Sequence, residues 1–409
     1  MAEAAAQFQK GLDQLALLPD KPERHRQELE FRSALGSVLM VVKGYAAPET
    51  GKAYARAREL WEQLGSPVEF LRVPYGQALY HAVRGEFELA LRLDEDLLFL
   101  SRQRSDTPGL VLAHQSLGRN LMWVGRFGSS RSHSEAGLTL YDPISHHPLV
   151  HQAGFHPQVV SKAALGLVLL CLGFPDRALS RSRAAIIEAQ SLAHPPSFAV
   201  SLAMGAKLLS LLGDNAALDE QADQLVAVAT EEGFPFYLAQ GTIYRGWVKV
   251  KTGDVAEGIS LLRRGATAYC ATGAKAWMPH HIALVSLASA IAGQIEDAVI
   301  QLDDAFQIVD RTGERWFEAE LHRHKGRLLL RQGQTDAAEW LYRKALSIAQ
   351  EQEAKLWELR AAMSLARLRR DQGRRAEARD LLTPVYSWFT EGFDTPDLKD
   401  AKALLDKLG

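Results

Sequence analysis

Apolar residues recur along the chain at the spacing of amphipathic helices, in stretches of roughly 16–18 residues separated by short polar breaks. A glycine lies in the break between the two helices of each pair, and from Gly173 onward this glycine recurs every 40 residues. The full column is Gly44, Gly85, Gly125, Gly173, Gly213, Gly253, Gly293, Gly333 and Gly373. Because glycine at such a position ends a helix in the left-handed conformation, the period predicts repeated helix–turn–helix hairpins.

Two further columns of small residues support this unit. Seven residues before the turn glycine the chain has Gly118, Gly166, Ala206, Gly246, Ser286, Gly326 or Ala366, and five residues after it the chain has Ala90, Ala178, Ala298, Ala338 or Ala378. Small residues at these places let the two helices of a hairpin approach closely. The sequence therefore predicts an all-α fold, a right-handed α-α superhelix of the tetratricopeptide-like solenoid type, with about nine helical hairpins.

The predicted organisation has four parts. Residues 1–141 contain an N-terminal helix and the first three hairpins, and residues 158–390 contain hairpins four to nine. Between them, residues 142–157 are rich in proline and histidine and lack a helical period, which predicts an irregular loop. Residues 391–409 are expected to form a capping helix.

Charge and composition limit the classes of partner that the chain is expected to bind. The 47 basic and 49 acidic residues leave a net charge of −2, so no global field would attract nucleic acid or an anionic membrane. The N-terminus lacks a secretory apolar segment, and the longest apolar run, residues 163–174, is too short to span a bilayer. We expect a cytoplasmic protein that has no membrane partner, no nucleic-acid partner and no cofactor.

Motifs for catalysis are missing from the sequence. It has no GxxxxGK[ST] phosphate loop and no GxSxG nucleophile elbow, and its two cysteines lie about a hundred residues apart. The chain is therefore predicted not to be an enzyme.

A row of arginines is the first candidate binding surface. The inner face of a tetratricopeptide-like array is lined by the first helix of each hairpin, and counting back from Gly333 and Gly373 places several arginines there, namely Arg323, Arg327, Arg331, Arg360, Arg367 and Arg370. Guanidinium groups bind carboxylates and phosphates bidentately, which suggests an acidic peptide or a phosphorylated ligand. A solvated face of ion pairs is the alternative, since Glu318, Glu320, Glu358 and Asp371 are close in sequence.

The inner positions of the central hairpins are mostly apolar. They include Gln240 and Trp247 as further candidate binding residues, with Lys207 and His280 as isolated polar groups. Such a floor suits an amphipathic helix or a small hydrophobic ligand. Burial against the next helix explains the same pattern.

Histidines cluster in the irregular segment and just before it. His146, His147, His151 and His156 are weak candidates for a metal site, with His133 nearby. Their spacing is not that of a helical HxxxH pair and no cysteine lies close by, so a polar loop is the simpler interpretation.

Several long phrases resemble a known architecture. They include "YARARELWEQLG" (54–65), "GFPFYLAQGTIYRGW" (233–247) and "TGERWFEAELHRHKGRLLL" (312–330). The chain resembles the C-terminal helical-repeat region of bacterial predicted ATPases, which are often fused to a class III adenylate/guanylate cyclase domain and are related in architecture to maltose-regulator-type activators. The resemblance implies a regulatory or sensing module that partners such domains, and it carries over no catalytic residue.

The sequence thus favours a non-catalytic scaffold that binds a protein, a peptide or a small-molecule effector and acts as a sensor in a bacterial signalling ATPase or cyclase system. Two alternatives stay open. One is RNA binding by helical repeats, and the other is metal binding through the histidine segment.

Overall fold

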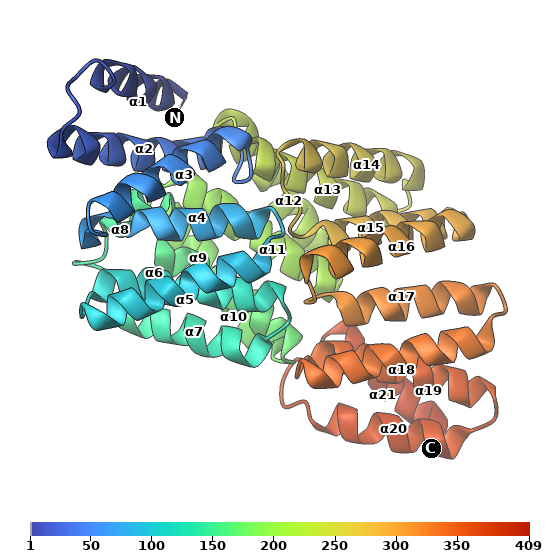
Figure 1. Cartoon of the computed structure of the whole chain (residues 1–409). Helices are drawn as coiled ribbons and strands as arrows, with labels where there is room; N and C mark the ends of the chain where they lie inside the picture. The colour runs from blue at the N-terminus through green and yellow to red at the C-terminus, as the bar shows by residue number, and fades with distance from the viewer. Residues whose placement is uncertain (1) are drawn as a thin grey trace.

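The computed structural model describes residues 2–409, except for the side chains of residues 2, 151 and 152. Within this range every regular element is a helix, and the helices stack in pairs into a superhelix (Figure 1). The prediction of an all-α, tetratricopeptide-like solenoid is confirmed.

The described range contains nine hairpins. The first five pair α2 (Pro22–Val42) with α3 (Pro48–Gln63), α4 (Arg72–Val83) with α5 (Phe87–Gln103), α6 (Thr107–Trp123) with α7 (Phe127–Leu140), α9 (Pro157–Cys171) with α10 (Pro175–Ser191), and α11 (Pro195–Leu212) with α12 (Asn215–Glu231). The other four pair α13 (Pro235–Lys251) with α14 (Val255–Ala271), α15 (Met278–Ile291) with α16 (Ile295–Thr312), α17 (Glu318–Arg331) with α18 (Thr335–Glu351), and α19 (Lys355–Asp371) with α20 (Arg375–Ser387). All nine turn glycines have a positive φ, between 75° and 115°.

Four elements lie outside the hairpins. Helix α1 (Ala2–Leu15) precedes the array and α21 (Pro396–Leu408) follows it. A short 3-10 helix, η1 (Val68–Phe70), joins the first two hairpins. The five-residue α8 (Leu149–Ala153) lies inside segment 142–157, so a segment expected to be an irregular loop has one turn of helix between two turn regions.

The column of small residues marks the point where the two helices of a hairpin cross. In the sixth hairpin, a Cβ atom on Gly246 of α13 would lie 2.7 Å from the backbone nitrogen of Leu262 on α14. A Cβ atom on Gly258 would lie 2.8 Å from the carbonyl oxygen of Gly246. These distances are shorter than any normal carbon contact, so the two backbones touch only because both residues lack a side chain.

The superhelix returns on itself after five hairpins. The carbonyl of Val83 accepts hydrogen bonds from the backbone N–H groups of Lys275 (2.8 Å) and Ala276 (3.0 Å). Forty residues further along each segment, the carbonyl of Trp123 accepts from Arg315 (2.9 Å) and Trp316 (3.1 Å).

The same offset recurs at the first hairpin. There the hydroxyls of Tyr45 and Tyr237 are 2.8 Å apart. We call these three contact points the seam; they join the first superhelical turn, hairpins one to five, to the second, hairpins six to nine. Figure 1 shows the two turns side by side, the first in blue to green and the second in yellow to red.

By length and composition alone, the 18-residue window Pro195–Leu212, which is helix α11, is long and apolar enough to cross a membrane. In the folded chain 72% of that window is buried. A core helix of a folded protein has the same character.

Candidate functional site: a basic groove on the inner face

A groove of about 510 Å³ runs along the inner face of the second turn. It is lined by the first helices of successive hairpins, α13, α15, α17 and α19, with the end of α11 closing one side. Trp247, Leu284 and Phe317 form part of an apolar floor. Five of the polar lining residues are basic, and the full set is Ser210, Lys251, His280, Glu320, Arg323, His324, Arg327, Arg331 and Arg360.

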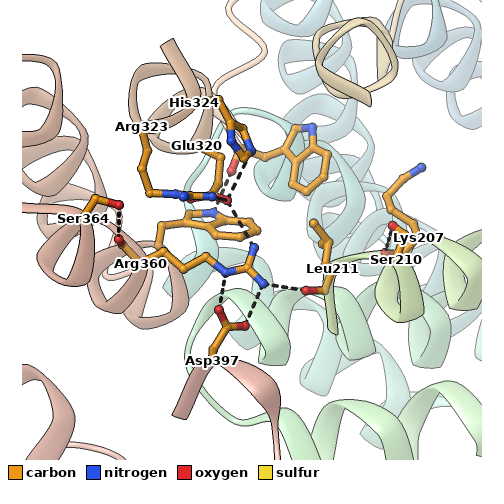
Figure 2. A network of polar contacts seen from close by, with 11 residues as sticks. Lys207, Ser210, Leu211, Glu320, Arg323, His324, Arg360, Ser364 and Asp397 are labelled. Atoms are coloured by element: carbon orange, nitrogen blue, oxygen red, sulfur yellow. Dashed lines mark hydrogen bonds and ion pairs between the residues drawn. The ribbon is translucent and has the colours of Figure 1, made fainter. Parts of the chain in front are cut away.

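Glu320 organises the arginines on one side of the groove. Its side chain is 1% exposed, and it accepts hydrogen bonds from Arg323 Nε (2.6 Å), Arg323 Nη2 (2.8 Å) and Arg360 Nη1 (3.2 Å) (Figure 2). Burial acts to raise the pKa of this carboxyl, but the two guanidinium groups outweigh it and hold the pKa well below its usual range. Glu320 is therefore a permanent anion at neutral pH.

Arg360 connects this side of the groove to distant parts of the chain. It donates to both carboxylate oxygens of Asp397 on α21 (2.9 and 2.7 Å) and to the carbonyl of Leu211 on α11 (2.5 Å) (Figure 2). Burial alone would lower the pKa of Arg360, and the carboxylates of Asp397 and Glu320 raise it above its ordinary value. The capping helix and the first superhelical turn thus hold one wall of the groove.

Three cations of the lining have no carboxylate within ion-pair distance among the residues that the structure describes. Arg331 donates to the carbonyl of Ala290 (3.0 Å), and the ammonium of Lys251 lies 5.6 Å from the centre of the Trp247 ring. Arg327 extends into the groove with no acidic partner, and desolvation together with neighbouring Arg323 lowers its pKa to about 10. Arg327 stays charged at neutral pH, and all three side chains line the same groove.

The structure brings together most of the arginines predicted from the sequence. Arg323, Arg327, Arg331 and Arg360 share the groove with Trp247. Arg367 and Arg370 are not part of its lining; Arg367 pairs with Asp400 (2.6 Å) and Arg370 with Asp371 (2.8 Å).

Gln240 also lies outside the groove, in the wall of a separate cavity.

A buried cluster of titratable side chains was not predicted as a unit. Lys207 is fully buried, donates to the hydroxyl of Tyr244 (2.9 Å) and lies 4.0 Å from the ring centre of Trp277. Burial lowers its pKa to about 7. Glu314 accepts hydrogen bonds from the N–H of Trp277 (3.0 Å) and from Trp316 Nε1 (2.9 Å), and burial raises its pKa to about 8.

The sequence alone offered only a weak signal for this cluster. Lys207 stood out as a polar residue on an apolar face, but Glu314 follows a glycine in an ordinary loop position. Only the superhelical packing brings the loop after α16 to the buried face of the preceding hairpins.

The histidine segment uses its described side chains for local contacts. His146 Nδ1 accepts from the N–H of Asp142 (2.9 Å), and His156 Nε2 lies 2.8 Å from the hydroxyl of Tyr141. The ring centres of His147 and His156 are 6.2 Å apart, and the side chain of His151 lies outside the described residues. Among the side chains that are described, no three His, Cys, Asp or Glu residues gather to hold a metal ion.

Among known proteins, the chain has a relative that is much longer than itself. No protein-family model matches the chain. An uncharacterized protein of Rhizobium meliloti (strain 1021) is 28% identical over 250 residues, which is 60% of this chain. The matched region spans only about a quarter (24%) of that relative's own length.

Solved structures share the fold at low sequence identity. A Rap protein complexed with Competence and Sporulation Factor has a TM-score of 0.58 and 13% identity, covering 86% of this chain and 98% of its own. The apo quorum sensor NprR of B. thuringiensis has a TM-score of 0.51 and 12% identity, covering 90% and 99%. The Rap conjugation gene regulator of plasmid pLS20, in complex with a Phr peptide, has a TM-score of 0.51 and 10% identity, covering 93% and 98%. By fold, the chain is similar to these tetratricopeptide-like superhelices.

Proposed function

We propose that the chain is a non-catalytic helical-repeat scaffold that binds an acidic peptide or protein segment in the basic groove. The observation that carries the proposal is the contrast between two sets of cations. Arg323 and Arg360 are fixed by Glu320 and Asp397, whereas Arg327, Arg331 and Lys251 line the groove with no carboxylate partner among the described side chains. A ligand that brings carboxylates or phosphates satisfies the second set.

The apolar floor makes a peptide a better occupant than a free anion. Trp247, Leu284 and Phe317 line the same groove as the cations, so the ligand should combine acidic side chains with apolar ones. Two proteins of similar fold were solved in complex with the Competence and Sporulation Factor or with a Phr peptide, which supports a peptide as the occupant.

We also propose that the scaffold serves as a cytoplasmic sensor module for a signalling ATPase or cyclase, with those domains as its partners. The resemblance of its sequence phrases to repeat regions of such proteins supports this role. The much greater length of the curated relative is consistent with it. RNA binding is less well supported, because the net charge is −2 and the groove cations alternate with apolar residues.

Fluorescence anisotropy with labelled peptides tests the groove. An acidic, leucine-containing peptide should bind the full chain, and its affinity should fall as salt is added. The double variant Arg327→Gln/Arg331→Gln should weaken binding by roughly 10- to 100-fold, because each lost charged hydrogen bond is worth about 1.5 kcal/mol or more. Arg263→Gln on α14, an exposed arginine of an outer helix, is the matched control and should leave affinity unchanged.

Two results would contradict the groove as the binding site. One is equal binding of a basic peptide with the same leucines. The other is an unchanged affinity in the double variant. If pooled RNA binds at low salt while acidic peptides do not, the chain belongs to the RNA-binding class instead.

A further inference from the structure

A second cavity, of about 70 Å³, lies at the seam and shares no residue with the basic groove. Its walls come from both superhelical turns. Tyr45, Val83 and Trp123 line it from the first turn, and Tyr237 and Trp277 line it from the second. Four of these residues make seam contacts themselves, namely Tyr45, Val83, Trp123 and Tyr237.

The wall carries one buried cation. Arg119 on α6 is 6% exposed and makes no ion pair within 4 Å among the described residues. Its Nη2 donates to Ser116 Oγ (2.7 Å) and its Nε to Asn120 Oδ1 (3.4 Å), while its Nη1 has no hydrogen-bond partner in the part of the chain that the structure describes. The nearest acid in this network, Asp94, is bound by Asn120 instead (2.5 Å).

A second donor of the lining is also unused. Trp123 is buried, and its Nε1 has no partner within the described structure. Trp123 packs beside Arg119, whose guanidinium carbon lies 5.8 Å from the ring centre of Trp123. Gln240, 3% exposed, adds a side-chain amide to the wall from the second turn.

The rest of the lining is apolar. Leu79, Met122, Phe155, Val160 and Ala203 are buried parts of it, and Val200 and Met204 on α11 are partly exposed. Leaving a buried donor unpaired costs about 1–3 kcal/mol, and more for a charged group. An apolar cavity that contains unpaired donors is therefore complementary to a small amphiphile with an anionic end.

We propose that this cavity binds a small monocarboxylic acid with a compact apolar body, whose carboxylate accepts from Arg119 and whose body packs against Leu79 and Phe155. Because roughly 10–15 Å³ is enough for one water molecule, the volume suits about five to seven non-hydrogen atoms. Butyrate and isobutyrate have this size. Because a ligand that fills the cavity also contacts Tyr237 and Trp277 of the second turn, it bridges both turns, and its binding stabilises the closed seam separately from the groove.

Calorimetric titration and thermal unfolding of the full chain with isobutyrate test the proposal. Isobutyrate should bind one site per chain and raise the unfolding midpoint by several degrees near 100 times its dissociation constant. Isobutyramide, which has the same shape without the charge, should bind at least about tenfold more weakly.

Two variants locate the site. Ala203→Leu places extra carbon atoms in the cavity and should abolish isobutyrate binding while leaving groove binding of an acidic peptide intact. Arg119→Met should also abolish isobutyrate binding and leave groove binding intact. That result would identify the guanidinium group as the partner of the carboxylate. If Arg119→Met does not fold, Ala203→Leu and the amide comparison decide the question.

Any of three results would overturn the proposal. The wild-type chain could show no binding of isobutyrate or butyrate, the amide could bind as tightly as the acid, or Ala203→Leu could keep the wild-type affinity. None of these results bears on the basic groove, because a loss of binding there would be detected only in the assay with the acidic peptide.

Discussion

A single buried carboxylate fixes the geometry of the groove. Glu320 is bound by the guanidinium groups of Arg323 and Arg360, with His324 Nε2 at 3.6 Å. Removing one partner from a buried ion pair costs more than the pair contributes, because the remaining charges are left in a poorly solvated place. Glu320 therefore presets the positions of two arginines before any ligand arrives.

Glu320→Gln should lower the free energy of unfolding by about 3 kcal/mol, because Arg323 and Arg360 then share a neutral partner. Urea denaturation at neutral pH measures this change. Glu377→Gln is the matched control, since Glu377 pairs with Arg374 on the surface, where water screens the pair; its effect should be much smaller. Equal effects in the two variants would show that the Glu320 cluster stabilises the fold no more than a surface ion pair does.

Asp94 should make stability depend on pH. Burial raises its pKa to about 7, although Arg119, Ser116 and Asn120 oppose that rise. An Asp in the unfolded chain has a pKa of about 3.9. Between these values the folded chain holds a proton that the unfolded chain has released, so this group makes folding less favourable as the pH rises from 4 to 7.

Asp94→Asn removes this titration while keeping an oxygen to accept from Asn120. Its free energy of unfolding should fall less steeply between pH 4 and 7 than that of the wild type, by up to about 1.4 kcal/mol per pH unit. Urea titrations of both proteins at several pH values measure the two slopes. Parallel slopes would mean that Asp94 ionises normally in the folded chain.

The positions of the candidate site residues were predictable only where the inner face was regular. Counting back from the turn glycines put Arg323, Arg327 and Arg331 on one face, and they line one groove because they follow one another at helical spacing on α17. Arg367 occupies the equivalent face of α19, but α21 brings Asp400 to it. The sequence shows no sign of that pairing, since the direction of the cap depends on tertiary packing.

At the scale of elements, the hairpins depend on close backbone approach. Gly246 and Gly258 lie opposite each other in the sixth hairpin, and neither position has room for a Cβ atom. Glycine normally weakens a helix interior by about 1 kcal/mol relative to alanine. Here the gain from packing α13 directly on α14 outweighs that loss.

Gly246→Ala should therefore destabilise the chain by about 1–3 kcal/mol despite the better helix propensity of alanine. Thermal unfolding measures the change. Gly128→Ala on α7 is the control, because a Cβ atom there would have its nearest neighbour at 3.5 Å, an ordinary contact. A Gly246 variant as stable as the wild type would mean that the helices separate at little cost.

The hairpins themselves were predictable because their signals are local. A turn glycine, a small residue seven positions earlier and an apolar face all lie within one 40-residue unit. The same approach missed α8, whose five residues are too few to show a helical period.

At the scale of the whole molecule, the seam turns an open solenoid into a closed body. Backbone hydrogen bonds at Val83 and Trp123 and the Tyr45–Tyr237 hydroxyl pair link residues about 192 positions apart. Trp277 lies at the centre of this contact, with its ring 5.3 Å from that of Trp123 and 5.1 Å from that of Trp316.

Trp277→Ala should cost about 3–5 kcal/mol and increase the radius of gyration, because the two turns lose the buried contact between Trp277 and Trp123. Small-angle scattering and urea denaturation measure the two effects. Trp340→Ala is the control, since Trp340 is 62% exposed on α18 and should change neither quantity. A destabilised Trp277 variant that stays equally compact would show that the backbone seam is sufficient for closure.

The closure was not predictable from the sequence. Each hairpin adds a small rotation to the superhelix. The number of hairpins in one full turn depends on the sum of these rotations, and no single rotation leaves a pattern in the local sequence. Only the contacts between the two turns, such as that of Val83 with Lys275, show that five hairpins complete one superhelical turn.

The five-hairpin return limits how this array can change in evolution. Open solenoids gain or lose single units freely, because each unit meets only its neighbours. Here a lost or duplicated unit between Val83 and Lys275 would put every later loop out of phase with its partner in the first turn. We therefore expect related chains to keep the same number of hairpins between these two contact points and to differ in repeat number only at the two ends.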